Sequence, residues 1–141
     1  MATLGTSGLD ELRLSMKEIE EIPDDVMDKM LNTQADIVLE AQKREGISQG
    51  VRDTGLTLES LRKGKPKRAK GGVKAIRITF HGSVRRGNKS VRFAEIAFVN
   101  NYGKKNQKAR PFVSDANEKC ARQSTEAAAN IYYAWLKSKN L

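Results

Sequence analysis

Residues 76–81 have the sequence Ile-Arg-Ile-Thr-Phe-His, in which apolar and polar side chains strictly alternate. Because successive side chains of a strand point to opposite faces, this alternation predicts a half-buried β-strand. The basic, glycine-containing residues 82–88 that follow are typical of a hairpin connection. Residues 91–99 are more continuously apolar, which predicts a returning strand that is buried more deeply. The stretch therefore indicates a small antiparallel sheet.

A long helix is predicted on the N-terminal side of this sheet. Pro23 suits the first turn of a helix and Gly46 suits its end, and between them apolar residues recur at intervals of three and four. The stripe consists of Met27, Met30, Leu31, Ala35, Val38 and Ala41. A shorter helix over residues 9–21 is predicted from the same spacing of Leu9, Leu12, Met16 and Ile19.

A second long helix is predicted at the C-terminal end. Ser114 is a residue suited to capping a helix N-terminus, and an apolar side follows it at helical spacing. That side carries Ala116, Cys120, Ala127, Ile131 and Trp135.

These elements predict an α+β fold, with a small antiparallel β-sheet flanked by a long helix in the N-terminal half and a long C-terminal helix. The length of 141 residues suits one domain, which we place over residues 9–141 after a flexible arm at 1–8. Exposed basic loops are expected at residues 62–72, 82–90 and 103–108. The expected core includes Leu31, Ile78, Phe80, Ile96 and Phe98.

Nothing in the sequence predicts export or a membrane span. The opening residues lack the pattern of a signal peptide, and the most apolar window, residues 127–136, is much shorter than the roughly 20 residues that cross a bilayer. The single cysteine excludes an internal disulfide. We therefore expect synthesis in a reducing cytoplasm, or export only as part of something larger, and no membrane partner.

Charge is distributed unevenly along the chain. The net charge is +9, but residues 1–61 hold 6 basic and 13 acidic side chains, whereas residues 62–141 hold 20 basic and 4 acidic ones. Such asymmetry indicates either contact with nucleic acid or electrostatic docking of one end onto another subunit. The acidic half argues against a plain nucleic-acid binder, because it repels phosphate unless it is folded away from it.

Residues that could carry catalysis are scarce. His81 falls on the polar side of the predicted strand without a nucleophile motif beside it, which favours a surface histidine over a catalytic base. Cys120 lies in an alanine-rich stripe, which favours a buried thiol over a reactive one. One histidine and one cysteine cannot form a Cys/His zinc site, and the sequence has no phosphate-binding loop. These features predict a protein that is not an enzyme and takes no cofactor or metal.

The basic loops and the residues near the last helix are the candidate contact sites. Residues 62–70 can be interpreted as a solvated connection, as a phosphate-binding arm or as a docking arm for an acidic partner. Phe112 can either pack the last helix on the sheet or contact a subunit. The candidate subunit or partner contacts are Arg62, Lys63, Lys65, Lys67, Arg68, Lys70, Arg85, Arg86, Tyr102, Lys104, Lys105, Arg110 and Phe112.

Four stretches stand out as motifs. Residues 8–12 are Gly-Leu-Asp-Glu-Leu, and residues 53–61 are Asp-Thr-Gly-Leu-Thr-Leu-Glu-Ser-Leu. Residues 93–103 are Phe-Ala-Glu-Ile-Ala-Phe-Val-Asn-Asn-Tyr-Gly, and residues 109–116 begin Ala-Arg-Pro-Phe-Val and end in Ala. In this order they resemble the motifs Gly-Leu-x-Glu-Leu, Thr-Gly-x-Leu…Ser-(Ile/Leu), Tyr-Ala-x-x-Val-Glu-x-Gly and Ala-Arg-Pro-Phe-Leu-x-x-Ala of a bacteriophage tail-component family. The chain departs from that pattern at Phe93, where the family has Tyr, and in Asn-Asn-Tyr, where it has Glu before the Gly.

The resemblance implies a structural virion protein of the phage neck or tail, which completes the tail and joins it to the head connector. It implies a ring around the DNA channel, built from copies of itself between head-connector and tail proteins, with non-specific proximity to DNA. The implied location is the virion, after assembly in the host cytoplasm, and the family has no catalytic residues to transfer. Two other functions stay open: a tail terminator that caps the tail tube, and a basic DNA-binding accessory protein.

Overall fold

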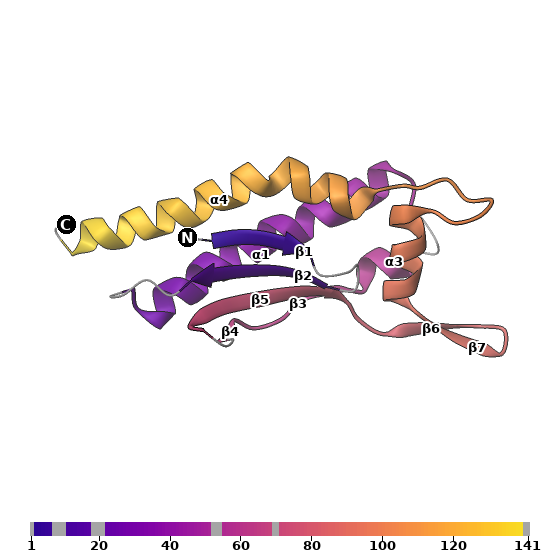
Figure 1. The fold of residues 1–141 in the computed structure, drawn as a ribbon, viewed down its shortest axis with the longest axis horizontal. Helices are drawn as coiled ribbons and strands as arrows, with labels where there is room; N and C mark the ends of the chain where they lie inside the picture. The colour runs from indigo at the N-terminus through magenta and orange to yellow at the C-terminus, as the bar shows by residue number, and fades with distance from the viewer. Residues whose placement is uncertain (1, 7–10, 18–21, 52–54, 69–70, 140–141) are drawn as a thin grey trace.

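The computed structural model describes residues 2–6, 11–17, 22–51, 55–68 and 71–139. The elements in chain order are β1 (Ala2–Thr6), β2 (Glu11–Lys17), α1 (Asp24–Ser48), α2 (Leu56–Glu59), β3 (Leu61–Lys63), β4 (Lys67–Arg68), β5 (Val73–Phe80), β6 (Ser83–Arg86), β7 (Lys89–Arg92), α3 (Phe93–Tyr102) and α4 (Phe112–Ser138). Figure 1 shows two long helices beside a sheet, with a hairpin projecting past one end. The predicted α+β class is confirmed.

The strand predicted from residues 76–81 is the centre of the main sheet. This sheet has the order β1-β2-β5-β3, with β4 pairing β5 as well, and every pairing is antiparallel. β5 pairs with β2 along one edge and with the short strands β3 and β4 along the other. Its alternating pattern leaves Ile76, Ile78 and Phe80 buried while Arg77 is exposed. The period of two in the sequence therefore identified the central strand.

The two long helices lie antiparallel on the buried side of the sheet. α1 contacts β2, β3 and β5, and α4 packs along α1. The antiparallel register is fixed by Gln42, whose Nε2 donates to Asn117 Oδ1 at 2.9 Å, and by Lys119, whose Nζ lies 3.0 Å from Glu45 Oε1. α1 is therefore covered by the sheet on one side and by α4 on the other.

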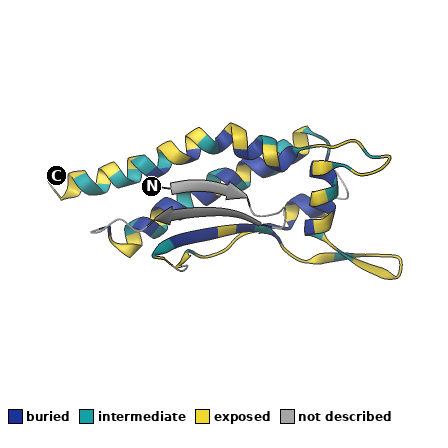
Figure 2. Ribbon diagram, in the orientation of Figure 1, coloured by how far each residue is buried: buried dark blue, intermediate teal, exposed yellow. Residues whose placement is uncertain are grey.

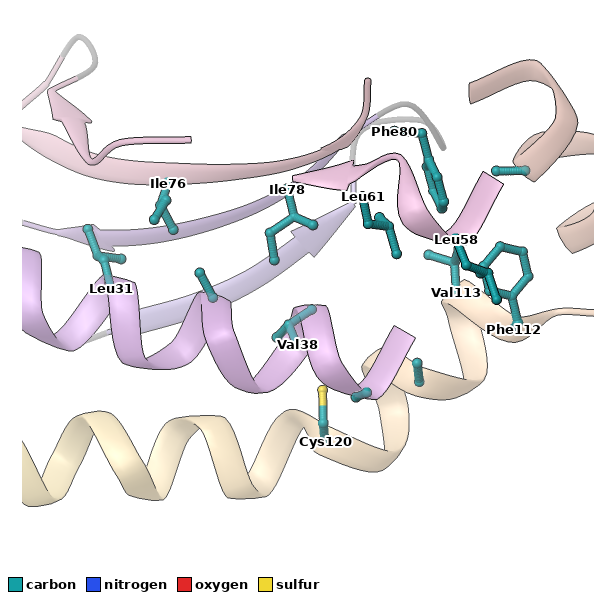
Figure 3. Packing of buried hydrophobic residues seen from close by; sticks show 14 of the residues in the cluster. Leu31, Val38, Leu58, Leu61, Ile76, Ile78, Phe80, Phe112, Val113 and Cys120 are labelled. Carbon is teal, nitrogen blue, oxygen red and sulfur yellow. The ribbon is translucent and has the colours of Figure 1, made fainter. Parts of the chain in front are cut away.

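The core lies between β5 and α1 and continues to the start of α4. In Figure 3, Ile76 and Ile78 point from the sheet toward Leu31 and Val38 of α1. At the far end of β5, the Phe80 ring meets the Phe112 ring edge to face, with centroids 6.1 Å apart. The predicted burial of Leu31, Ile78, Phe80 and Ile96 is confirmed.

The strand predicted over residues 91–99 is wrong. β7 ends at Arg92, and residues 93–102 form the helix α3. The buried residues of this segment lie at helical spacing, and they are Ala94, Ile96, Ala97, Asn100 and Asn101. Phe98 falls on the other side of the helix and is 51% exposed, so its predicted burial is also wrong. A short apolar run fits both periods, and here packing on α2 and α4 decides for the helix.

The predictions for the N-terminal residues are wrong as well. A helix was expected over 9–21, but Glu11–Lys17 form β2, which pairs with β5 over its whole length. A flexible arm was expected over residues 1–8, but Ala2–Thr6 form the strand β1. Residues 1, 7–10 and 18–21 lie outside the described residues. The apolar residues of this segment also fit a period of two, and pairing with the central strand selects it.

Two of the three predicted loops contain strands. Within 62–72, Arg62 and Lys63 of β3 and the two-residue β4 pair with β5, which corrects the prediction of an unpaired loop at these positions. Residues 64–66 and 71–72 lie outside any strand, and residues 69–70 lie outside the described residues. Residues 82–90 do not join two strands of the main sheet but form a hairpin of their own from β6 and β7. This hairpin is almost entirely exposed along its length (Figure 2). The third segment, 103–108, is a loop as predicted, closed by a bridge between Lys104 and Gln107.

The long helices begin or end a few residues away from the predicted positions. Pro23, which was predicted for the first turn, is the N-cap of α1, and the helix continues past Gly46 to Ser48. Gly46 is instead a point of close approach, because a Cβ there would lie 2.5 Å from Leu58 Cδ2. α4 begins at Phe112 rather than after Ser114.

The uneven charge of the sequence is partly neutralised within one subunit. Basic side chains of the second half reach carboxylates of α1: Lys63 lies 2.7 Å from Asp36, and Arg68 pairs with Asp24. Lys74, whose side chain is buried, pairs with Asp28. The acidic and basic halves are therefore folded against each other, which is a third explanation of the asymmetry beside nucleic acid and subunit docking.

Candidate functional site

The residues considered for catalysis are separated in the structure. His81 is exposed just after β5, where its backbone N–H donates to the Ser60 carbonyl oxygen at 2.9 Å. Cys120 is buried in the contact between α1 and α4, and burial raises the pKa of its thiol. Over the described ranges, no three side chains of His, Cys, Asp or Glu are grouped so that they could hold a metal ion. These residues therefore offer no assembled reaction centre.

Cys120 is expected to react slowly with a thiol reagent such as a disulfide-exchanging dye in the folded protein. Its side chain is only 3% exposed, and burial disfavours the thiolate that is the reactive form. At neutral pH the native rate should fall at least about a hundredfold below the rate in denaturant, since reaction then requires opening of the α1–α4 contact. Equal rates in the two states would contradict the burial of this thiol.

A cleft opens at the end of the molecule that carries the β6–β7 hairpin. Its volume is about 480 Å³, and it lies between the hairpin, α3, the 103–108 loop and the residues just after α1. Three basic side chains line it, and they are Arg86, Lys104 and Arg110. We call this feature the basic cleft. Its volume falls in the range of ligand-binding pockets.

The wall of the basic cleft beside the cations is aliphatic. Val91 of β7 and Ile96 and Val99 of α3 supply it, together with the single carboxylate of Glu95. Asn100 and Gln107 add polar groups, but the Asn100 side chain is engaged, because its Nδ2 donates to the Ile96 carbonyl oxygen at 2.9 Å. The cleft therefore combines an apolar surface with excess positive charge.

Arg110 is held at the edge of the basic cleft by backbone hydrogen bonds. Its own N–H donates to the Asn100 carbonyl oxygen at 2.6 Å, and its Nη1 donates to the Gly50 carbonyl oxygen at 3.0 Å. Two further backbone bonds between Lys104 and Gln107, at 3.1 and 2.9 Å, close the intervening loop. The loop thus presents Lys104 and Arg110 from a fixed backbone.

Gly103 makes this loop possible, and replacing it with alanine is expected to cost roughly 2–3 kcal/mol of unfolding free energy. Its φ is +78°, and an added Cβ would lie 2.8 Å from the Gln107 carbonyl oxygen and 2.9 Å from the Ala109 nitrogen. Gly50 is the matched control, because it has the same φ and no atom within 4 Å of the added Cβ. Gly50→Ala should cost only about 1 kcal/mol. Similar midpoints of urea unfolding for both variants would contradict a steric role for Gly103.

A smaller cleft of about 170 Å³ lies under the other side of the hairpin. It is lined by Leu56 and Thr57 of α2, by Val84 and Arg85 of β6 and by Phe93 of α3, and it shares Arg86 and Ile96 with the basic cleft. Thr57 is 1% exposed, and its hydroxyl oxygen has no hydrogen-bond partner among the described residues. The two clefts therefore share an arginine that lies next to the turn of the hairpin.

The structure brings together some of the predicted contact residues and separates others. Arg86, Lys104 and Arg110 line the basic cleft, Arg85 lines the smaller one, and Lys105 is exposed in the adjoining loop. Tyr102 is exposed on α3, with its ring 5.0 Å from that of Phe98. The remaining exposed candidates lie along the β3–β4 edge, and they are Arg62, Lys63, Lys65, Lys67 and Arg68. Lys70 lies outside the described residues.

Phe112 does not belong to this surface. Its ring is fully buried against Phe80, so it packs the last helix on the sheet and is not exposed for a subunit contact. This is the first of the two interpretations that the sequence left open.

Sequence reasoning missed two parts of this region. The aliphatic wall was assigned to a strand, so the approach of Ile96 and Val99 to the basic loops was not foreseen. The role of Asn101 was also missed: its Oδ1 accepts the N–H groups of Val113 and Ser114, at 3.1 and 3.3 Å, and so caps α4 from α3. The run Asn-Asn-Tyr-Gly at residues 100–103 was the only signal for it.

No model of a known family matches the chain, and neither a curated protein nor a solved structure matches it. Among the described residues, no helix is both long and apolar enough to cross a membrane.

Proposed function

We propose that this protein is a structural component of a bacteriophage neck or tail, which completes the tail and joins it to the head connector as part of a ring. The proposal starts from the four motifs and adds an assembly surface that suits such a role. It assigns no catalytic step, cofactor or metal to the protein. The partners that it implies are copies of the chain and the neighbouring head-connector and tail proteins.

The observation that carries the proposal is an exposed aromatic pair on α3. Phe98 and Tyr102 are 51% and 58% exposed, and their rings meet edge to face. Aromatic side chains are enriched in the centres of protein interfaces, and most hot-spot energy comes from such anchors. Both residues lie in the stretch 93–103 that resembles the tail-component family.

The projecting hairpin supports the same role. β6 and β7 pair with each other and with no strand of the main sheet. A two-stranded hairpin is marginally stable by itself in water, so contact with a neighbouring molecule would add to its stability. A ring requires a heterologous interface, in which one surface meets a different surface of the next copy. The hairpin and the opposite end of α4 supply two distinct surfaces (Figure 1).

The motif segments also pack against one another. α2 and the start of β3 come from the second motif, α3 from the third, and the start of α4 from the fourth. α3 contacts both α2 and α4, and Leu58 lies near Phe112 and Val113 in Figure 3. The resemblance therefore concerns residues that build one end of the fold, which favours a shared architecture.

The proposal is tested in the phage or prophage that encodes the chain. Loss of the gene product should give DNA-filled heads and separate tails by electron microscopy, and the protein should be found in purified complete virions. A variant with serine at both Phe98 and Tyr102 should fold with an unchanged unfolding midpoint and fail to restore joining. Complete virions without the protein would contradict the proposal. Tails of unregulated length would instead favour a tail terminator.

The exposed cations favour a DNA-binding accessory protein as the second candidate. Arg62 and Lys67 stand opposite Thr79 and Ala75 on the side of the sheet away from α1. Each phosphate contact adds about −0.9 to the logarithmic salt slope of duplex binding. A slope shallower than about −2 favours the neck protein, because so few phosphate contacts do not suit a dedicated DNA binder. A slope of about −5 or steeper favours the accessory protein.

A further inference from the structure

We infer that the basic cleft binds a peptide segment of a partner protein that combines acidic and aliphatic side chains. The inference concerns the chemistry of the cleft and holds whether or not the protein belongs to a phage particle.

Positive charge at the edge of the cleft selects for a carboxylate. Arg86, Lys104 and Arg110 are set against the one carboxylate of Glu95. Arg110 is positioned in advance by its bond to the Gly50 carbonyl oxygen, which lowers the conformational entropy lost on binding. A guanidinium presents its remaining N–H groups in a planar fork that matches a carboxylate. Acidic side chains are therefore the complementary groups.

The wall of the cleft selects for aliphatic side chains and against nucleotides. Val91, Ile96 and Val99 form a branched aliphatic surface, and no aromatic ring lines the basic cleft among the described residues. Single-stranded nucleic acids are bound by stacking their bases on aromatic rings, and duplex DNA is contacted mostly through its phosphates and sugars, which an aliphatic wall does not complement. A leucine or valine side chain fills it and gains free energy from burial.

The two clefts adjoin each other, because Arg86 and Ile96 line both of them. The smaller cleft lies beside α2, where the Thr57 hydroxyl is shielded from solvent, so the peptide contacts that carry the inference are those of the basic cleft. A peptide of acidic and aliphatic residues matches the cations and the aliphatic wall of that cleft.

The test uses the whole protein and fluorescein-labelled synthetic peptides, followed by fluorescence anisotropy at about 0.15 M salt. The main probe is Asp-Leu-Glu-Val-Asp-Leu-Glu. One control probe replaces Leu and Val with Ser, and the other replaces Asp and Glu with Lys. We expect the main probe to bind at least about tenfold more tightly than either control. If the serine probe bound as tightly as the main probe, the cleft would attract acidic peptides by charge alone, without selecting aliphatic side chains. If no probe bound, the inference would be overturned.

Variants then locate the bound peptide. Lys104→Glu reverses one charge in a loop that is closed by backbone hydrogen bonds between Lys104 and Gln107, and Arg110→Gln removes the fixed guanidinium. Each substitution should lower the affinity for the main probe about tenfold or more. The unfolding midpoint of Lys104→Glu should change little. Lys65→Glu is the matched control, because Lys65 is exposed on the other edge of the molecule, and it should change affinity less than about twofold.

Two further outcomes would contradict the inference. An equal loss of binding in Lys65→Glu and Lys104→Glu would show that net charge, and not the cleft, holds the peptide. Displacement of the main probe by unlabelled duplex DNA at comparable concentration would assign the cleft to phosphate instead. Failure of the proposed neck function would leave these peptide results unchanged, so the two proposals are separately testable.

Discussion

Replacing Phe112 with alanine is expected to lower the free energy of unfolding by about 3–5 kcal/mol. The side chain is fully buried where β5, α2 and the start of α4 meet, and its ring contacts Phe80 edge to face. Removing it takes away transfer free energy, leaves a cavity between elements that cannot collapse fully, and deletes an aromatic pair. Urea unfolding followed by circular dichroism measures the change.

Phe98→Ala is the matched control for this prediction. The same six-carbon ring is removed, but Phe98 is about half exposed on α3 and contacts Tyr102 rather than the core. Its loss should cost no more than about 1 kcal/mol, since surface substitutions have small effects. Comparable losses for the two variants would contradict the helical assignment of residues 93–102 and would restore the buried strand that the sequence first indicated.

Replacing Asn101 with alanine is expected to cost about 2–4 kcal/mol. Its Oδ1 accepts two backbone N–H groups of the first turn of α4, and its Nδ2 donates to Ser114 Oγ at 3.2 Å. Since α4 has no capping side chain from its own N-cap residue, Pro111, alanine leaves these donors without a partner at a buried helix end. Thermal unfolding and hydrogen exchange of the Val113 amide would both report the loss.

The neighbouring residue provides the comparison. Asn100 is also buried, but its side chain donates only to the Ile96 carbonyl oxygen within its own helix. Asn100→Ala should therefore cost about 1 kcal/mol, because no donor from another element loses its partner. If Asn100→Ala were the more damaging change, the link between α3 and α4 would not depend on Asn101.

The parts of the fold that the sequence predicted are those with one unambiguous period. Ile76, Ile78 and Phe80 fit only a period of two, and the stripe from Met27 to Ala41 fits only the helical period. Residues 93–99 form a short apolar run that fits either period, so their structure depends on neighbours that the sequence does not reveal. In residues 11–17, Leu12, Leu14 and Met16 alternate with polar residues, so the period of two is present there beside the helical spacing of Leu9, Leu12, Met16 and Ile19. Asn101 also hid the helical period of residues 93–102, because a buried asparagine counts as polar when buried positions are predicted from hydrophobicity.

The sequence predicted the charged residues of the candidate site, but it did not predict that they line one cleft. Arg86 and Lys104 are candidates because they lie in basic, glycine-containing segments, and Arg110 is a candidate because it precedes the last helix, but the sequence does not show that the three lie together. They meet because β6 and β7 pair with each other and because Gly103 adopts a positive φ that turns the chain back. Neither the hairpin pairing nor the turn at Gly103 produces a periodic pattern in the sequence. Ile96 and Val99 reach the cleft because residues 93–102 form a helix, and the apolar run 93–99 had been interpreted as a strand.

The position of α1 between the sheet and α4 has a consequence for synthesis on the ribosome. The nascent chain makes α1 before the central strand that covers one of its sides, and it makes α4 after every other described element. Until the first turns of α4 have been made, the side of α1 that holds Ala41 and Gln42 has no cover, because Gln42 bonds to Asn117. A product that terminates before α4 would expose that strip and be open to proteolysis. Closure of the core therefore has to follow synthesis of α4.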